Sequence, residues 1–147
     1  MKKLVVLITV LILLLVVFHF TKTTIQIRNM TEGNVCIFVG TSERDVDPDY
    51  EELKASRRAL LVPPMEAIYF SLSLADYFMK KGEVNIGWRI GGVAGAETKR
   101  VAYRNLHIVS GMKYCSLKID ISEHADRVFY MDGGVCIKSI EMPLELK

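Results

Sequence analysis

The sequence lacks the short motifs that mark most kinds of catalytic and metal site. It has three cysteines but no CxxC pair, which argues against a thioredoxin-type redox centre and a cysteine-rich zinc site. It contains neither GxSxG nor HExxH, and its three histidines do not have metal-ligand spacing. We therefore expect a protein that binds a partner, is not an enzyme, and uses no catalytic residue, cofactor or metal.

An excess of charge of one sign is also missing. The chain has 19 Lys plus Arg and 17 Asp plus Glu, so setting aside Lys2 and Lys3 leaves 17 of each kind. A surface that reads phosphates shows a basic excess. We therefore expect no nucleic-acid partner. The sequence also has no internal repeat and no low-complexity linker, so we expect one domain after the first segment.

That first segment is a long apolar run from Leu4 to Phe20, in which only Thr9 and His19 are polar. A soluble helix does not need apolar side chains on every face. As a helix, the run is about 25 Å long, slightly less than a typical hydrocarbon core of roughly 30 Å. We predict that residues 1–22 form a signal-anchor transmembrane segment.

Lysines at the two ends set the expected topology of this segment. Lys2 and Lys3 precede the run and Lys22 follows it, so their side chains can extend to the interface as membrane anchor ends. Residues 17–23 lack an Ala-x-Ala-like site, which favours a retained anchor over a cleaved secretory signal. The positive-inside rule then predicts a single-pass protein of the inner membrane, with a cytoplasmic N-terminus and a periplasmic or extracellular domain.

Residues 23–147 are expected to form this extracytoplasmic β-rich domain. Alternating polar and apolar residues, interrupted by turn signals, predict about eight strands. Their approximate ranges are 24–28, 35–39, 66–74, 83–90, 99–109, 113–121, 127–131 and 135–140. The first two are predicted to form a hairpin through the turn residues 31–34. The overall prediction is a mainly antiparallel β-sandwich or barrel with one short helix near residues 48–58.

Two of these strands carry definite predictions of which side chains are buried. In the range 83–90 the inward residues are Val84, Ile86, Trp88 and Ile90, and the outward residues are Asn85, Gly87 and Arg89. In the range 66–74 the inward residues are Ile68, Phe70, Leu72 and Leu74. Trp88 is the expected centre of the core.

The three cysteines Cys36, Cys115 and Cys136 would face an oxidising compartment in this topology. One disulfide with one remaining thiol is therefore possible. The pair Cys115 and Cys136 is favoured, because both cysteines lie in the C-terminal group of predicted strands. Three buried thiols acting as small apolar side chains are an equally good interpretation.

Two segments resemble ligand loops only in part. Asp45, Asp47 and Asp49 have the spacing of the first calcium ligands of an EF-hand, but the later glycine and glutamate are absent. An acidic helix N-terminus explains all three aspartates, and we favour it over a calcium site. The stretch from Gly91 through Gly92 and Gly95 to Glu97 fits no phosphate-binding motif. We interpret it as an exposed hairpin loop and a candidate recognition loop.

Two further groups are weighed as functional sites. Ser122, Glu123, His124 and Asp126 would support hydrolysis only if the fold supplied a nucleophile and an oxyanion site, and we favour a solvated turn. Asn29 to Thr31 matches the N-glycosylation acceptor.

These observations predict a membrane-anchored extracytoplasmic module that binds a protein partner of unknown identity. An accessory subunit of an envelope complex and an immunity-type protein that neutralises a toxin in the periplasm both fit this prediction. A membrane-tethered hydrolase that uses His124 and Asp126 is the enzyme alternative. The sequence does not distinguish between them.

Overall fold

The computed structural model describes residues 2–43, 59–79, 81–91, 98–111, 114–131 and 135–143. The side chains of residues 18–20 lie outside this description. The predicted helix near residues 48–58 also lies outside it, as do the three aspartates of the calcium hypothesis and most of the glycine-rich loop.

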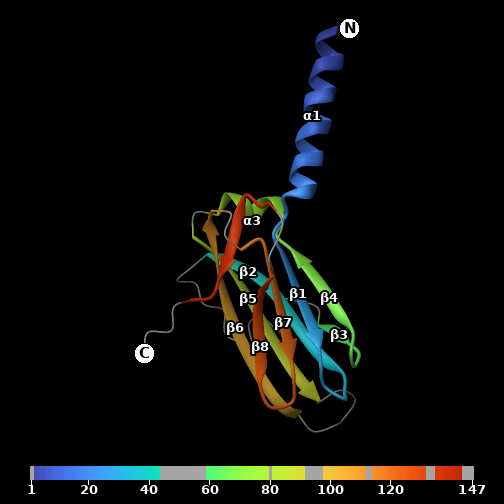
Figure 1. The fold of residues 1–147 in the computed structure, drawn as a ribbon, viewed down its shortest axis with the longest axis vertical. Helices are drawn as coiled ribbons and strands as arrows, with labels where there is room; N and C mark the ends of the chain where they lie inside the picture. Colours follow the sequence, from blue (N-terminus) through green and yellow to red (C-terminus); the bar gives the residue numbers. More distant parts are fainter. Residues whose placement is uncertain are drawn as a thin grey trace.

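The described elements are mainly strands (Figure 1). Their bounds are α1 (Lys2–Phe20), β1 (Thr24–Asn29), β2 (Val35–Glu43), β3 (Leu60–Val62), β4 (Ala67–Ser71), α3 (Leu74–Phe78), β5 (Gly82–Gly91), β6 (Thr98–Ser110), β7 (Ser116–Ile121), β8 (Asp126–Met131) and β9 (Lys138–Glu141). The prediction of a mainly β domain with a short helix is confirmed at this level, although the described short helix is α3.

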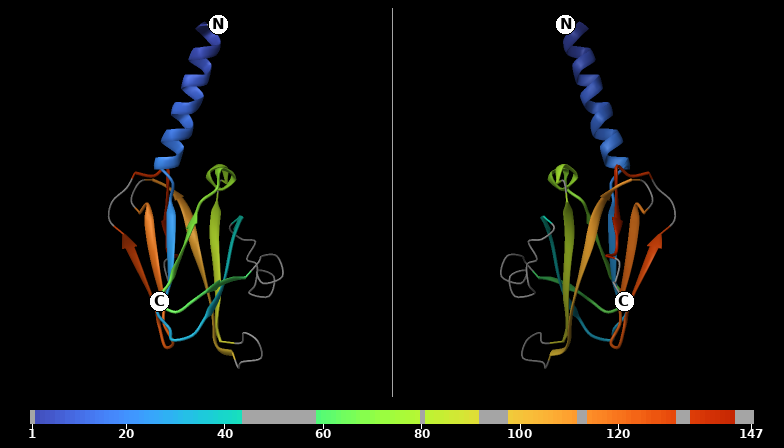
Figure 2. Two further views of the ribbon diagram at one scale, coloured as in Figure 1. Left: turned by 90° about the vertical axis from the view of Figure 1, so that its right-hand side faces the viewer. Right: turned by 90° about the vertical axis from the view of Figure 1, so that its left-hand side faces the viewer.

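The strands form two facing sheets, which Figure 2 shows edge-on as two layers. One sheet has four strands in the order β4-β1-β7-β8, and the other has five in the order β3-β2-β5-β6-β9. All neighbouring strands are antiparallel except β1 and β7, which pair in parallel from Thr24↔Ser116 to Asn29↔Ile121. The helix α1 continues directly from the layer that contains β1 (Figure 2).

The core lies between the sheets, and Trp88 belongs to it as predicted. Trp88 is fully buried in one continuous apolar cluster that draws on both sheets. Val84, Ile86 and Ile90 of the same strand also belong to the cluster. The alternation in β5 therefore identified the core face correctly.

The opposite face of β5 is not exposed, contrary to the prediction. Asn85 is fully buried. Its Nδ2 donates to Ser42 Oγ at 2.7 Å, and its Oδ1 accepts from the Tyr103 hydroxyl at 3.1 Å. Because β5 is the central strand of its sheet, neighbouring strands supply polar partners on this face, and a buried amide is stable when it is hydrogen-bonded.

The predicted hairpin of the first two strands is wrong, because β1 and β2 belong to different sheets. The connection between them crosses from one layer to the other and is organised by Asn29, which is fully buried. Asn29 Nδ2 donates to the carbonyls of Gly33 at 2.7 Å and Val62 at 2.9 Å, and Oδ1 accepts from Thr31 N at 2.8 Å. The glycosylation match therefore falls on a structural side chain.

The strand predicted over 66–74 is also shorter than expected. It ends at Ser71, and Ser73 then begins α3 with a capping box. Ser73 N donates to Asp76 Oδ2 at 2.6 Å, and Asp76 N donates back to Ser73 Oγ at 3.4 Å. Ile68 and Phe70 pack against the core and Leu72 is buried, but Leu74 falls on the helix and is 57% exposed.

The helix α1 contains the apolar run of the sequence. Its leucine, isoleucine and valine side chains from Leu4 to Val17 are exposed by 46 to 66%. Among the described residues, no helix combines the length and the apolarity that a membrane crossing requires. The predicted transmembrane segment is therefore not supported by the structure.

Candidate functional site

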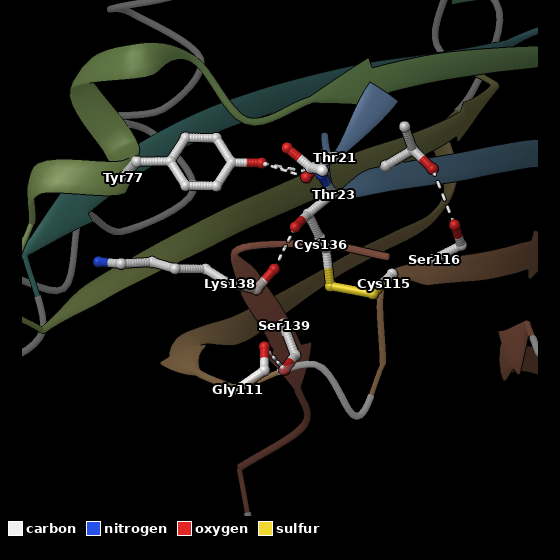
Figure 3. The surroundings of a disulfide bond; sticks show 10 residues. Thr21, Thr23, Tyr77, Gly111, Cys115, Ser116, Cys136, Lys138 and Ser139 are labelled. Atoms are coloured by element: carbon white, nitrogen blue, oxygen red, sulfur yellow. Dashed lines mark hydrogen bonds between the residues drawn. A yellow bond between two sulfur atoms is a disulfide. The ribbon is translucent and has the colours of Figure 1, made fainter. Parts of the chain in front are cut away.

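Two regions of the domain are built from unusual side-chain contacts. The first is the junction, by which we mean Thr21 to Thr23 between α1 and β1 together with their partners on α3 and β9. Figure 3 shows Tyr77 of α3 pointing toward Thr21 and Thr23. The Tyr77 hydroxyl accepts from Thr23 N at 2.9 Å and lies 3.5 Å from the Thr21 carbonyl, to which it donates.

The junction is also tied to the start of β9. The Thr23 hydroxyl donates to the carbonyl oxygen of Lys138. The ammonium group of Lys138 reaches back to α3 and donates to the Met79 carbonyl at 2.7 Å. Thr23 is fully buried, so its hydrogen-bonding groups need these partners, and together they fix the path of the chain as it leaves α1.

A disulfide lies against the same segment (Figure 3). It joins Cys115 and Cys136, with an S–S distance of 2.08 Å, and this is the pair that the sequence favours. The carbonyl of Cys115 accepts a hydrogen bond from Thr24 N at 3.1 Å, so the cross-link is connected to the first residue of β1. Cys36 is a buried free thiol.

Exposed apolar side chains occur on α3 and beside the disulfide. On α3, which supplies Tyr77, Leu74 is 57% exposed and Phe78 is 80% exposed. On either side of Cys136, Val135 and Ile137 are also exposed by more than half. We call these four residues the apolar rim. The helix α3, which carries two of them, lies at the end of the domain from which α1 emerges (Figure 1).

The second region is the cleft, a cavity of about 670 Å³ between the edges of the two sheets. In the part of the chain that the structure describes, β9 pairs with β6 from His107 to Ser110, and β7 is the neighbour of β8. The two sheets are therefore open to each other between β6 and β8. The described lining residues are Tyr103, Arg104, Asn105, Leu106, Asp126, Val128, Tyr130, Met142 and Pro143.

An ion pair crosses between the sheets beside the cleft. Arg100 of β6 donates through Nη1 to Asp126 Oδ1 at 3.0 Å and through Nη2 to Asp126 Oδ2 at 2.6 Å. Its Nη1 also donates to the Ser122 carbonyl at 3.1 Å. The Asp126 side chain is only 2% exposed, and a two-point contact with a guanidinium compensates the burial of its charge.

The opposite side of the cleft carries the chain segment that follows β9. Met142 N donates to the Tyr130 hydroxyl at 3.0 Å, and Pro143 is the next residue along the chain. The ring of Tyr130 also stacks on that of Tyr114, with 3.9 Å between their centroids. Tyr130 is therefore held on two sides.

Arg104 is the unusual residue of the cleft. It shares the inward face of β6 with Ala102 and Leu106, both of which contribute to the core. Its Nε is buried and has no hydrogen-bond partner. Within the described part of the chain, Arg104 forms no ion pair. A guanidinium is always charged, so the cleft has an uncompensated positive group beside the neutralised pair of Arg100 and Asp126.

The structure separates the residues of the hydrolase hypothesis. The hydroxyl of Ser122 bonds to the backbone of Ala125, Glu123 pairs with Lys99 at 3.2 Å, and Asp126 is occupied by Arg100. His124 is exposed in the connecting loop and has no described contact with Ser122. These residues do not form a hydrogen-bonded nucleophile and base.

Of the other candidates that the structure describes, only Lys22 belongs to one of these regions: it lies in the junction and is half-buried. Lys2 and Lys3 begin α1. Gly91 ends β5 with a φ of 77°, whereas Gly92, Gly95 and Glu97 fall outside the described residues. His107 Nε2 lies 3.0 Å from Glu83 Oε1 on the neighbouring strand.

The sequence analysis missed Arg100, Arg104 and Tyr77. A signal for the arginines is present, because strict alternation from residue 100 to 108 places both on the same face as Ala102, Leu106 and Ile108. A charged residue on an apolar strand face is an informative exception. No comparable signal identifies Tyr77, whose role depends on where α3 meets the segment after α1.

Comparisons with known proteins add no relationship: no family model, no curated protein and no solved structure matches this chain.

Proposed function

We propose that the protein is a membrane-anchored extracytoplasmic module that binds a protein partner. The observation that carries the proposal is that α1 exposes apolar side chains all around its axis, from Leu4 to Val17. Water is an unfavourable environment for such a surface. The described side chains of α1 end at Val17, whereas the apolar run of the sequence continues to Phe20.

The junction and the apolar rim support the same proposal. The chain leaves α1 through a segment that is hydrogen-bonded to α3 and β9, so the domain has a defined attachment to the helix. Leu74 and Phe78 are exposed on α3, which lies at the end of the domain from which α1 emerges (Figure 1). Aromatic and aliphatic side chains in this position fit the interfacial region of a bilayer.

Placement of the domain outside the cytoplasm rests on two features. Lys2 and Lys3 precede the apolar run, which favours a cytoplasmic N-terminus. The disulfide between Cys115 and Cys136 fits an oxidising compartment.

A protein partner is supported by the edges formed by β3 and β4. These edge strands are consecutive in the chain and belong to different sheets. Exposed apolar side chains accumulate there: Leu60, Leu61, Met65 and Tyr69. A sheet edge with exposed apolar side chains is a common docking surface for another chain.

Membrane attachment is tested by extraction of full-length protein with alkaline carbonate. The unaltered chain should stay in the membrane pellet. The double variant L11K/L14K should move to the supernatant, because each lysine near the centre of a span costs roughly 2.5 to 3.5 kcal/mol. The matched control is Leu4→Lys, which makes the same change at the end of the helix, where the ammonium reaches the interface. Equal extraction of all three proteins contradicts the anchor.

The location of the domain in an oxidising compartment is tested separately. Intact cells are quenched with acid to trap the thiols, and the unfolded chain is then alkylated to count the free thiols. One reactive thiol for each chain, that of Cys36, is expected. Three reactive thiols contradict exposure to an oxidising compartment.

Partner binding is tested by placing a photo-cross-linking amino acid at Leu61 in the full chain in its own membrane. A single stoichiometric adduct is expected. Phe129, whose side chain is 44% exposed against 50% for Leu61, provides the control position on β8. A toxin as the adduct identifies an immunity-type protein, and an envelope component identifies an accessory subunit. Identical products from both positions, or none from Leu61, contradict docking at this edge.

A further inference from the structure

We infer that the cleft between β6 and β8 binds a small amphipathic organic anion, whose acid group contacts Arg104 and whose apolar body lies against Val128, Tyr130 and Met142. This site is independent of the proposed protein-binding edge, which is formed by β3 and β4. It is also independent of membrane attachment, since none of its residues belongs to the junction.

The size and shape of the cleft fit a small molecule. A volume of about 670 Å³ falls within the range of ligand pockets, roughly 300 to 1,000 Å³. The ion pair of Arg100 with Asp126 and the contact of Met142 with Tyr130 hold β6, β8 and the last described segment together. These contacts keep the space between the sheet edges defined without closing it.

The chemistry of the lining selects the charge of the ligand. Among the described lining residues, Arg104 is the one that carries a positive charge. Its buried Nε has no hydrogen-bond partner among them. Asp126 lines the same space, but its two carboxylate oxygens are already bonded to Arg100. The three groups together carry one net positive charge, and a carboxylate or phosphate is the usual partner of a free guanidinium.

The rest of the lining includes the polar residues Tyr103 and Asn105, but it also has apolar surface that favours an apolar body. Val128 and Tyr130 are partly buried and pack against the core cluster to which Leu106 belongs. Met142 and Pro143 add further apolar surface. A ligand that carries an anionic head on an aromatic or aliphatic body would satisfy Arg104 and also cover these side chains.

The position of Arg104 is energetically unfavourable without a partner, and this supports the presence of a ligand. A charged side chain on the inward face of a strand is unfavourable when its hydrogen-bonding groups are unpaired. Arg100 precedes Arg104 by four residues and lies on the same face of β6. Its hydrogen bonds to Asp126 show how a residue of the chain can pair such a guanidinium. Arg104 has no equivalent partner in the described residues, and a bound anion would provide one.

The test titrates probes into the 15N-labelled full chain in phosphatidylcholine nanodiscs and follows backbone amide resonances. The probes are indole-3-acetate, its neutral analogue indole-3-acetamide, and inorganic phosphate. Indole-3-acetate should give saturable shifts in β6 and β8 around Arg104 and Val128. The acetamide should bind at least about tenfold more weakly because it lacks the charge, and phosphate should bind more weakly because it lacks the apolar body.

Variants assign the preference to Arg104. Arg104→Met and Arg104→Gln should both abolish the difference in affinity between indole-3-acetate and indole-3-acetamide. Two variants are used so that the test still works if one of them misfolds. Arg104→Lys should retain a reduced preference. The matched control Arg127→Met removes a cation from the adjacent, outward-facing position next to Asp126 and should leave the preference unchanged.

The result is overturned by equal affinity for the acid and the amide, by an unchanged preference in both neutral Arg104 variants, or by the absence of saturable shifts in the cleft with indole-3-acetate. Shifts confined to α1 or the apolar rim would show that the probe partitions at the lipid interface, and this result also overturns the proposal.

Discussion

The junction and the cleft are built in opposite ways. At the junction, Thr23 is buried and its amide and hydroxyl groups both have partners within the chain. In the cleft, Arg104 places a charge between the sheets, and its buried Nε has no such partner among the described residues. A segment whose polar groups are all paired holds a fixed geometry, whereas an unpaired charge beside a cavity favours a ligand. We therefore propose attachment as the role of the first region and recognition as the role of the second.

Loss of the disulfide, which lies beside the junction, should lower the unfolding free energy more than the other changes proposed below. Cys115 and Cys136 are 21 residues apart, and opening a loop of this size costs about 3 kcal/mol of unfolding free energy. Chemical denaturation of C115S/C136S in detergent should show this loss. A reductant should destabilise the unaltered protein and a Cys36→Ala variant, but not the double variant. Equal sensitivity of all three to reductant would contradict a structural disulfide.

Breaking the ion pair beside the cleft should cause the second-largest loss of unfolding free energy. Asp126→Asn leaves the Arg100 guanidinium without its counter-charge, but Arg100 is 28% exposed and can partly reach water. We expect a loss of about 2 kcal/mol in unfolding free energy. Glu123→Gln is the control, because its pair with Lys99 is exposed and should contribute less than about 0.5 kcal/mol. Similar losses in the two variants would mean that the cleft is not held by this pair.

Removing one hydroxyl should test the junction more finely. Tyr77→Phe deprives the buried Thr23 amide of its acceptor, which should cost about 1 kcal/mol. Hydrogen exchange at Thr23 should become faster. Tyr69→Phe removes an exposed hydroxyl that accepts from Gln26 and should leave both quantities nearly unchanged. Unaltered exchange at Thr23 in Tyr77→Phe would show that the junction does not depend on this bond.

The smallest effect on stability is expected for Arg104→Met. Its guanidinium has no described partner, so replacing it with an apolar side chain should change the unfolding free energy by less than about 0.5 kcal/mol or increase it. Thermal unfolding without added ligand measures this. A loss above about 2 kcal/mol would show that Arg104 supports the fold, and the contrast between the two regions would disappear.

The sequence by itself determined the features that depend on local pattern. Alternation placed Trp88, Val84 and Ile86 in the core, because side chains on successive strand residues point to opposite faces. The same pattern identified the C-terminal strands β7 and β9, which begin shortly after Cys115 and Cys136. Continuous apolar residues from Leu4 to Phe20 marked α1 as a segment apart from the domain.

Tertiary structure decided which strands became neighbours and which polar residues were buried. A turn signal after β1 indicates a change of direction but not the sheet that the chain enters, so the hairpin prediction failed where Asn29 directs the crossing. Asn85 was expected outside because alternation does not show that Ser42 and Tyr103 would cover and bond it.

The cleft was decided by tertiary structure for the same reason. Arg100 and Arg104 look equivalent in the sequence, since both lie on the inward face of β6. Their difference arises because β8 brings Asp126 opposite one of them and apolar side chains opposite the other. Pairing across two sheets depends on contacts between residues distant in the chain, and a local pattern carries no information about them.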